Sequence, residues 1–220
     1  MEKIKVIIFD MDGVLVDTET LWSKTDKELL KRRGIEYNDG YKLEIMGRSP
    51  EKVAALFKSR FNLKEKPEEI KKERENIVYG FYKTKLKLIP NTLVLLKKLH
   101  KAGFTLALAS SAPSKLINVV LKKFKLGKYF SVRVSGQFIK KGKPAPDIYL
   151  HTAKKLKAKP QNCLVIEDAP SGVKAAKKAG MYCIGFLDER YVKRKDLLEA
   201  KADLIVSDFK EINIKIIEEL

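Results

Sequence analysis

The chain has 220 residues, of which 45% are hydrophobic and 34% are charged, and this composition excludes a disordered chain. Its apolar runs are all shorter than the roughly 20 residues that a membrane helix needs, and its first residues lead into a strand without a signal-peptide pattern. We therefore expect a cytoplasmic protein that has no membrane partner.

The net charge of the chain is +18, from 46 lysines and arginines against 28 acids. Such a balance can indicate nucleic-acid binding. The lysines, however, recur in pairs along the whole chain with glutamates among them, and we find no nucleic-acid motif. We therefore interpret the charge as a solvated surface, which also fits a protein from a hot environment, and expect no nucleic-acid partner. A non-catalytic nucleic-acid-binding protein stays open as an alternative.

The chain begins with an apolar run over residues 4–9 that predicts a buried β-strand. Helical periodicity then dominates residues 18–85. One helix is expected over residues 20–33, one beginning at Pro50 and one over residues 67–84. Because no convincing strand pattern interrupts these helices, residues 18–85 are predicted to form a helical insertion.

After residue 90, helix and strand patterns alternate along the chain. Strands are predicted over residues 104–109, 132–135, 163–166, 182–187 and 204–206, and helices over residues 92–102, 114–124, 171–179 and 146–156, the last with Tyr149 and Leu150 on its apolar face. This alternation is typical of a parallel, doubly wound sheet with right-handed crossovers. The sequence thus predicts an α/β core from residues 1–17 and 86–220, with the helical domain over residues 18–85 inserted into it.

The two cysteines, Cys163 and Cys183, each begin an apolar, strand-like run. Free cysteines in cytosolic proteins commonly behave as small buried apolar residues. We predict that both are buried and reduced.

A pair of carboxylates follows the first predicted strand, in the sequence Asp10-Met11-Asp12-Gly13. In open α/β sheets, ligands bind beyond the carboxyl ends of the strands. Gly13 permits the tight backbone turn that this position requires. Taken alone, the same residues also describe an ordinary polar turn.

Further polar residues follow the other predicted strands, among them Ser110, Ser111, Lys143, Glu167 and Asp168. Each has an ordinary interpretation as a loop serine, a solvated lysine or an acid at a helix N-terminus. In a parallel sheet, however, all of them share one edge with the first pair of aspartates. We therefore interpret them together as one site.

Several converging carboxylates repel one another and raise each other's pKa unless a cation compensates them. Carboxylate and carbonyl oxygens suit Mg²⁺, which takes a further oxygen from a phosphate. Lys143 and a hydroxyl group can bind the remaining phosphoryl oxygens. In this setting Asp10 can attack phosphorus, while Asp12 protonates the leaving oxygen and later accepts a proton from water.

These motifs, in this order, resemble those of the haloacid dehalogenase superfamily, in the branch with a helical cap after the first strand. The resemblance covers residues 6 to about 206. It implies a Rossmann-like doubly wound parallel sheet with an inserted α-helical cap domain. It also implies the following roles: Asp10 as phosphoryl acceptor, Asp12 as acid and base, Ser110, Ser111 and Lys143 as phosphate binders, and Mg²⁺ on Asp10, the Asp12 carbonyl and Asp168, with Glu167 binding directly or through water.

A weaker likeness to sugar-phosphate phosphatases lies in residues 17–22 and 46–49. It makes Glu19, Trp22, Gly47 and Arg48 candidate substrate contacts. Three of them also have an ordinary interpretation: a tryptophan of the helical core, a surface arginine, and a glutamate that accepts a backbone N–H. β-Phosphoglucomutase is similar as well, but it carries a cap histidine where this chain has tryptophan.

The sequence therefore predicts a monomeric, Mg²⁺-dependent phosphomonoester phosphatase. Its substrate would be a small phosphorylated metabolite, first of all a sugar phosphate, and the reaction would pass through an aspartyl-phosphate. Phosphoglycolate phosphatase and a β-phosphoglucomutase-like phosphomutase remain alternatives. Asp12 argues against a dehalogenase, because the phosphate-transferring members of the superfamily carry this second aspartate.

Overall fold

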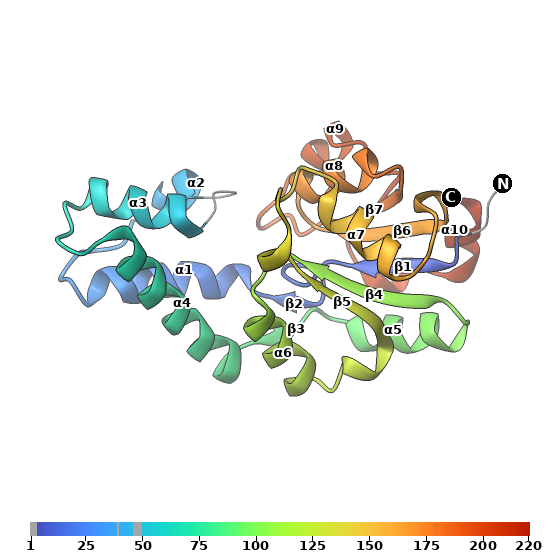
Figure 1. The fold of residues 1–220 in the computed structure, drawn as a ribbon, viewed down its shortest axis with the longest axis horizontal. Helices are drawn as coiled ribbons and strands as arrows, with labels where there is room; N and C mark the ends of the chain where they lie inside the picture. Colours follow the sequence, from blue (N-terminus) through green and yellow to red (C-terminus); the bar gives the residue numbers. More distant parts are fainter. Residues whose placement is uncertain (1–3, 39, 46–49) are drawn as a thin grey trace. The chain divides into compact units, whose positions relative to one another are not determined.

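A computed structural model describes residues 4–38, 40–45 and 50–220 of the chain, and for Glu19, Lys42 and Leu43 it describes the backbone alone. The chain divides into two compact units (Figure 1). The core unit consists of Met1–Asp17 and Lys87–Leu220, and the helical unit of Thr18–Leu86. In the part of the chain described, no helix is long and apolar enough to span a membrane.

The core unit is built on one parallel sheet of six strands in the order β5-β4-β1-β6-β7-β8. The strands are β1 (Val6–Phe9), β4 (Thr105–Ser110), β5 (Phe130–Ser135), β6 (Cys163–Glu167), β7 (Tyr182–Phe186) and β8 (Leu204–Val206). Strand β1 lies inside the sheet, where Val6 pairs with Thr105 of β4 and with Cys163 of β6. All four of its residues are apolar and buried, as expected for a parallel strand that is covered on both faces. The predicted α/β fold with a doubly wound parallel sheet is confirmed.

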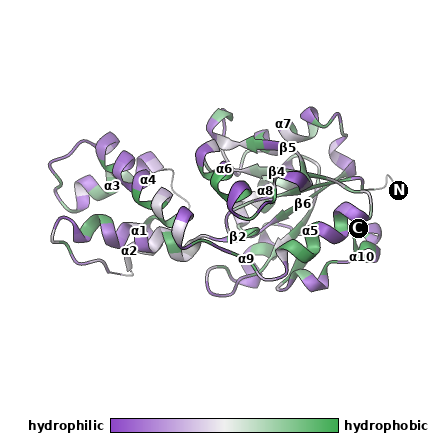
Figure 2. Cartoon of the chain, turned by 90° about the horizontal axis from the view of Figure 1, so that it is seen from below, coloured by the Kyte–Doolittle hydropathy of each residue, from purple (hydrophilic) through white to green (hydrophobic). Residues whose placement is uncertain are grey.

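Helices cover both faces of this sheet, with α7 and α8 on one side and α5 and α6 on the other (Figure 1). The helices of the core unit are α5 (Thr92–Lys101), α6 (Ser114–Lys123), α7 (Asp147–Lys155), α8 (Pro170–Lys178), α9 (Arg194–Glu199) and α10 (Ile214–Glu219), joined by the 3₁₀ turns η1 (Gly127–Tyr129), η2 (Gly136–Phe138), η3 (Pro160–Asn162) and η4 (Phe209–Glu211). Figure 2 shows the mainly hydrophobic strands and the hydrophilic residues on the helices and loops around them.

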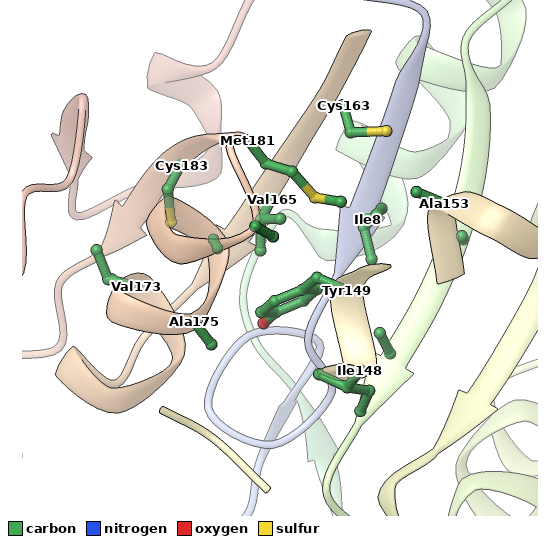
Figure 3. Packing of buried hydrophobic residues seen from close by; sticks show 14 of the residues in the cluster. Ile8, Ile148, Tyr149, Ala153, Cys163, Val165, Val173, Ala175, Met181 and Cys183 are labelled. Carbon is green, nitrogen blue, oxygen red and sulfur yellow. The ribbon is translucent and has the colours of Figure 1, made fainter. Parts of the chain in front are cut away.

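The face under α7 and α8 holds a large apolar cluster that includes Val165 of β6, Val173 of α8 and Tyr149 of α7 (Figure 3). Both cysteines belong to this cluster, and both are buried and free, as predicted. One detail of the predicted helix face was wrong. Leu150 is 40% exposed, whereas its neighbour Ile148 is buried, because the helix turns Ile148 and Tyr149 toward the sheet.

The chain leaves and re-enters the core unit through a second, two-stranded sheet. Its strands are β2 (Val16–Asp17) and β3 (Lys87–Leu88), which pair antiparallel with Asp17 opposite Lys87. The backbone N–H of Ile89 donates to the carbonyl oxygen of Leu15 at 3.0 Å and extends this pairing. The two ends of the helical unit are thus held side by side.

The helical unit contains α1 (Glu19–Lys31), α2 (Gly40–Ile45), α3 (Pro50–Arg60) and α4 (Pro67–Thr84). Two of these helices begin at a proline, whose fixed φ suits the first helical position. The unit has an apolar core of its own, formed around Leu30, Phe57 and Ile70. The short helix α2 was not predicted, because six residues are too few to show a period.

A buried ion pair joins α1 and α4 inside the helical unit. The Arg74 guanidinium donates from Nε to Asp26 Oδ1 at 2.6 Å and from Nη2 to Asp26 Oδ2 at 3.2 Å. Asp26 is fully buried, and burial raises the pKa of its carboxyl although Arg74 opposes this shift. The Trp22 ring lies 4.6 Å from the same guanidinium and stacks on it.

Replacing Arg74 by methionine should lower the free energy of unfolding by about 3–5 kcal/mol, because Asp26 would remain buried without its partner. Urea denaturation at pH 7 measures this loss. The control is Arg32→Met, since the Arg32 side chain is 48% exposed and its pairs with Glu28 and Glu73 should each contribute about 1 kcal/mol at most. An equal loss of unfolding free energy in the two variants would contradict the stabilising role of the buried Arg74–Asp26 pair.

Candidate active site

Asp10 and Asp12 follow the carboxyl end of β1, at the edge of the sheet where its parallel strands end. Asp10 is 5% exposed, and its backbone N–H donates to the carbonyl oxygen of Ile166 at 3.0 Å. The turn that follows contains Gly13 with φ of +78°. A Cβ on Gly13 would stand 1.9 Å from Asp168 Oδ2, so this glycine both allows the turn and leaves room for the Asp168 carboxylate.

Lys143 links two of the acids. Its ammonium donates to Asp10 Oδ1 at 2.7 Å and to Glu167 Oε1 at 2.5 Å. The Lys143 side chain is 9% exposed, so this lysine is not one of the solvated surface lysines. The Lys143–Pro144 peptide bond is cis. The two hydrogen bonds of Lys143 join the loop between β5 and α7 to the ends of β1 and β6.

Glu167 is the last residue of β6, and both of its carboxylate oxygens accept hydrogen bonds. Oε1 accepts from Lys143 and also from the Tyr149 hydroxyl at 2.8 Å. Oε2 accepts from the backbone N–H of Ala169 at 3.0 Å. Gly172 in α8 leaves the necessary space, because a Cβ there would stand 1.7 Å from Glu167 Oε1. Three hydrogen bonds thus hold the Glu167 carboxylate in place.

Ser110 ends β4 and is fully buried beside the first motif. Its hydroxyl donates to Asp12 Oδ2 at 3.3 Å and accepts from the backbone N–H of Ala112 at 3.0 Å. Ser111 follows as the first exposed residue of the loop, and its backbone lies against Gly136. Both serines therefore stand at the same sheet edge as the acids.

Three acids of this edge form a group that can hold a metal ion. Asp10, Glu167 and Asp168 each offer a carboxylate oxygen, and these oxygens all lie within 4.8 Å of one another. Such a purely oxygen-donating set suits a hard cation such as Mg²⁺ rather than zinc. The residues present therefore fit the metal that the sequence predicts.

The electrostatics of the site show why a cation would be favourable. Burial is the largest cause that raises the pKa of the Asp10 carboxyl; the Lys143 ammonium opposes it, the charges of Glu167 and Asp12 add to it, and together they bring the pKa to about 7. Burial lowers the pKa of Lys143, but the charges of Asp10 and Glu167 outweigh it and hold that pKa well above its usual value. One ammonium thus only partly compensates the carboxylates, and a divalent cation would favour the ionised form of Asp10.

The four candidate residues of the insertion belong to the helical unit and not to the core unit. Trp22 lies in the helical unit, where it stacks on Arg74. Glu19 is the first residue of α1, and only its backbone is described. Gly47 and Arg48 lie outside the described residues.

Two residues of the site were missed in the sequence. Tyr149 was assigned to the apolar face of its helix, and Gly172 fell within the helix predicted over residues 171–179 without a role of its own. The only signal in the sequence is that tyrosine carries a hydroxyl that needs a partner when buried. For Gly172 no local signal exists, because glycine is needed there only to leave room for the Glu167 side chain, five residues earlier.

Fold and site together define an α/β enzyme whose acidic site lies at the carboxyl edge of a parallel sheet. The sequence profile of the haloacid dehalogenase-like hydrolases matches residues 7–186. The chain belongs to this family, and its relatives identify it as a phosphoric monoester hydrolase.

Two curated relatives and one solved structure illustrate this membership. A phosphorylated carbohydrates phosphatase of Thermotoga maritima is 33% identical over 211 residues, which cover 96% of this chain and 98% of that protein. A fructose-1-phosphate phosphatase of Escherichia coli is 28% identical over 180 residues, or 82% of this chain and 95% of that protein. The crystal structure of a HAD hydrolase of family IA, variant 3, from Entamoeba histolytica has a TM-score of 0.85 at 29% identity and covers 98% of both chains.

Proposed function

We propose that the protein is a Mg²⁺-dependent phosphatase that hydrolyses phosphorylated carbohydrates through an aspartyl-phosphate on Asp10. The observation that carries this proposal is the position of the Lys143 ammonium, 2.7 Å from Asp10 Oδ1 at the edge where the acids converge. A carboxylate can attack a phosphate dianion only if positive charge reduces their repulsion, and this arrangement provides it.

The first half of the reaction transfers the phosphoryl group to Asp10. A carboxylate oxygen of Asp10 forms a bond to phosphorus, while the bond between phosphorus and the ester oxygen breaks. Asp12 gives its proton to that leaving oxygen, so the sugar departs as an alcohol. Asp12 Oδ2 accepts a hydrogen bond from the Ser110 hydroxyl at 3.3 Å, and this contact helps to orient the Asp12 carboxyl group.

The second half releases phosphate. Asp12, now ionised, accepts a proton from a water molecule, whose oxygen attacks phosphorus. The bond between phosphorus and the Asp10 oxygen breaks, and Asp10 returns to its carboxylate form. One aspartate thus serves as acid and then as base, which explains why the motif needs two aspartates at this spacing.

The remaining residues bind the phosphoryl group and the metal. Lys143, Ser110 and Ser111 hold phosphoryl oxygens. Asp10, the Asp12 carbonyl and Asp168 would hold Mg²⁺, with Glu167 in support. Bound there, the ion neutralises charge on the carboxylates and the phosphoryl oxygens. Both oxygens of Glu167 already accept hydrogen bonds, which favours support through water over direct ligation.

The substrate class rests on the relatives, two of which are named for phosphorylated carbohydrates and for fructose 1-phosphate. We propose that the helical unit acts as the cap and selects the sugar, with Glu19, Trp22, Gly47 and Arg48 as the candidate contacts. We further propose a cytoplasmic monomer whose positive surface attracts anionic metabolites without binding nucleic acid.

The proposed function is tested by incubating the purified protein with Mg²⁺ and a panel of phosphorylated metabolites, and by measuring the phosphate released. The panel should contain hexose phosphates, glycerol 3-phosphate, phosphoglycolate and β-glucose 1-phosphate. Fastest release from a sugar phosphate is expected. Preference for phosphoglycolate, or isomerisation of glucose phosphate without release, would replace the proposed substrate or reaction.

Removing the metal should stop turnover, because the carboxylates would then repel the phosphate dianion. Protein treated with EDTA should release no phosphate above background, and added Mg²⁺ should restore the full rate. Zn²⁺ should restore little, since the donor set consists of oxygen atoms. Undiminished turnover in the chelator would rule out the proposed metal dependence.

A further inference from the structure

Tyr149 is fully buried in the core unit, yet one end of it is polar. Its ring belongs to the apolar cluster between α7 and the sheet, where it lies beside Val165 (Figure 3). Its hydroxyl donates to Glu167 Oε1 at 2.8 Å. The side chain therefore reaches from the apolar core to the acidic edge.

The oxygen that Tyr149 contacts is shared with the site. Glu167 Oε1 also accepts from the Lys143 ammonium at 2.5 Å, and the same ammonium donates to Asp10 Oδ1 at 2.7 Å. The Lys143 ammonium also lies 5.2 Å from the centre of the Tyr149 ring. A continuous chain of contacts thus runs from Tyr149 through Glu167 and Lys143 to Asp10.

A hydroxyl at this position is not needed for packing. Phenylalanine would fill the same space, and burying a hydroxyl costs free energy unless it forms a hydrogen bond. Burial, and then the charge of Glu167, raises the pKa of Tyr149 well above its usual value, so its hydroxyl remains a donor. The benefit of tyrosine over phenylalanine must therefore lie in what it does to Glu167.

We propose that Tyr149 is a positioning residue for phosphoryl transfer: its hydroxyl holds Glu167 Oε1 so that Lys143 is shared between Glu167 and Asp10. With two donors on one oxygen, Glu167 attracts Lys143 less strongly, and the ammonium stays available to Asp10 and to the phosphoryl group. Without the hydroxyl, Lys143 alone compensates that oxygen and is drawn toward Glu167. This inference rests on the proposed function.

The test compares Tyr149→Phe with Tyr129→Phe, which removes the hydroxyl of another buried tyrosine of the core unit. Two quantities are measured with Mg²⁺ present: kcat and KM for the best substrate, and the Kd of inorganic phosphate by calorimetry. Tyr149→Phe should lower kcat and raise the Kd of phosphate, each about tenfold, as is usual for residues that support a site indirectly. Tyr129→Phe should leave both within twofold of the wild type, and circular dichroism should show both variants folded.

A double-mutant cycle with Glu167→Ala separates positioning from a general structural role. If Tyr149 acts through Glu167, adding Tyr149→Phe to Glu167→Ala should change the Kd of phosphate less than twofold. A full tenfold effect in that background would overturn the proposal, as would a single Tyr149→Phe variant that matches the wild type. If Glu167→Ala does not fold, the comparison of the two tyrosine variants decides alone.

The two proposals fail in distinguishable ways. A wild-type protein that binds phosphate but hydrolyses no phosphomonoester overturns the proposed function, while the Kd values still decide the role of Tyr149. A wild-type protein that hydrolyses sugar phosphates, together with an unaffected Tyr149→Phe variant, overturns only the role of Tyr149.

Discussion

Asp10→Asn should abolish turnover, with a loss of about 10⁴-fold or more in kcat, because the amide cannot form the covalent bond to phosphorus. Steady-state release of phosphate from p-nitrophenyl phosphate measures this loss. The matched control is Asp203→Asn. Asp203 lies at the amino end of β8, whereas the site lies at the carboxyl ends of the strands, and it pairs with Lys177 at the surface. The control should keep the wild-type rate, and Asp10→Asn at that rate would rule out Asp10 as nucleophile.

The same substitution should stabilise the metal-free protein at neutral pH. The pKa of Asp10 rises from 3.8 to about 7 on folding, so between these values the folded state holds a proton that the unfolded state has released. The contribution of Asp10 to stability is therefore complete below about pH 4 and is lost as the pH rises to about 7. The free energy of unfolding is measured with urea in EDTA at pH 5 and at pH 8. Between these pH values it should fall more for the wild type than for Asp10→Asn. Equal losses would contradict the raised pKa.

Asp12→Asn should slow both halves of the reaction, by roughly 10²–10⁴-fold each for substrates with a poor leaving group. Nitrophenolate leaves without a proton, so the variant should still phosphorylate Asp10 rapidly but release phosphate slowly. The expected result is a burst of one nitrophenol per protein, together with an adduct of about 80 Da, the mass of one phosphoryl group, on the peptide that contains Asp10.

An alkyl phosphate is the control for this experiment, because its leaving group needs the proton and should give no burst. The idea that Asp10 accepts the phosphoryl group would be falsified if the adduct mapped to Ser110. A variant without burst and without adduct would instead show that Asp12 is required for the first step with every substrate.

Much of the fold could be predicted from the sequence because β1 and β7 are unbroken apolar runs and β6 is apolar up to its last residue. The four buried residues of β1 have no polar residue among them, and α4 carries a clear helical period and a proline at its start. The helices α9 and α10 were missed because each has only six residues, too few for a period to appear.

The candidate site could be predicted to the extent that topology alone brings its residues together. Parallel strands place Asp10, Ser110 and Glu167 at one edge whatever their side chains do. Tyr149 was missed because its contact with Glu167 depends on how α7 packs against the sheet, which the sequence pattern of the helix does not show. The same holds for Gly172, where an added methyl group would overlap the Glu167 carboxylate.

The pairing of Asp17 with Lys87 bears on how the chain folds and how it can change during evolution. For the core sheet to form, β1 must pair with β4, although the whole helical unit separates the two strands in the sequence. The entropy cost of closing such a loop grows only with the logarithm of its length, by about 0.6 kcal/mol for each doubling. Lengthening, shortening or exchanging the insertion between these two paired residues therefore costs the core little. The proposed cap can therefore change, and with it the substrate, while the proposed phosphate chemistry on the sheet edge stays the same.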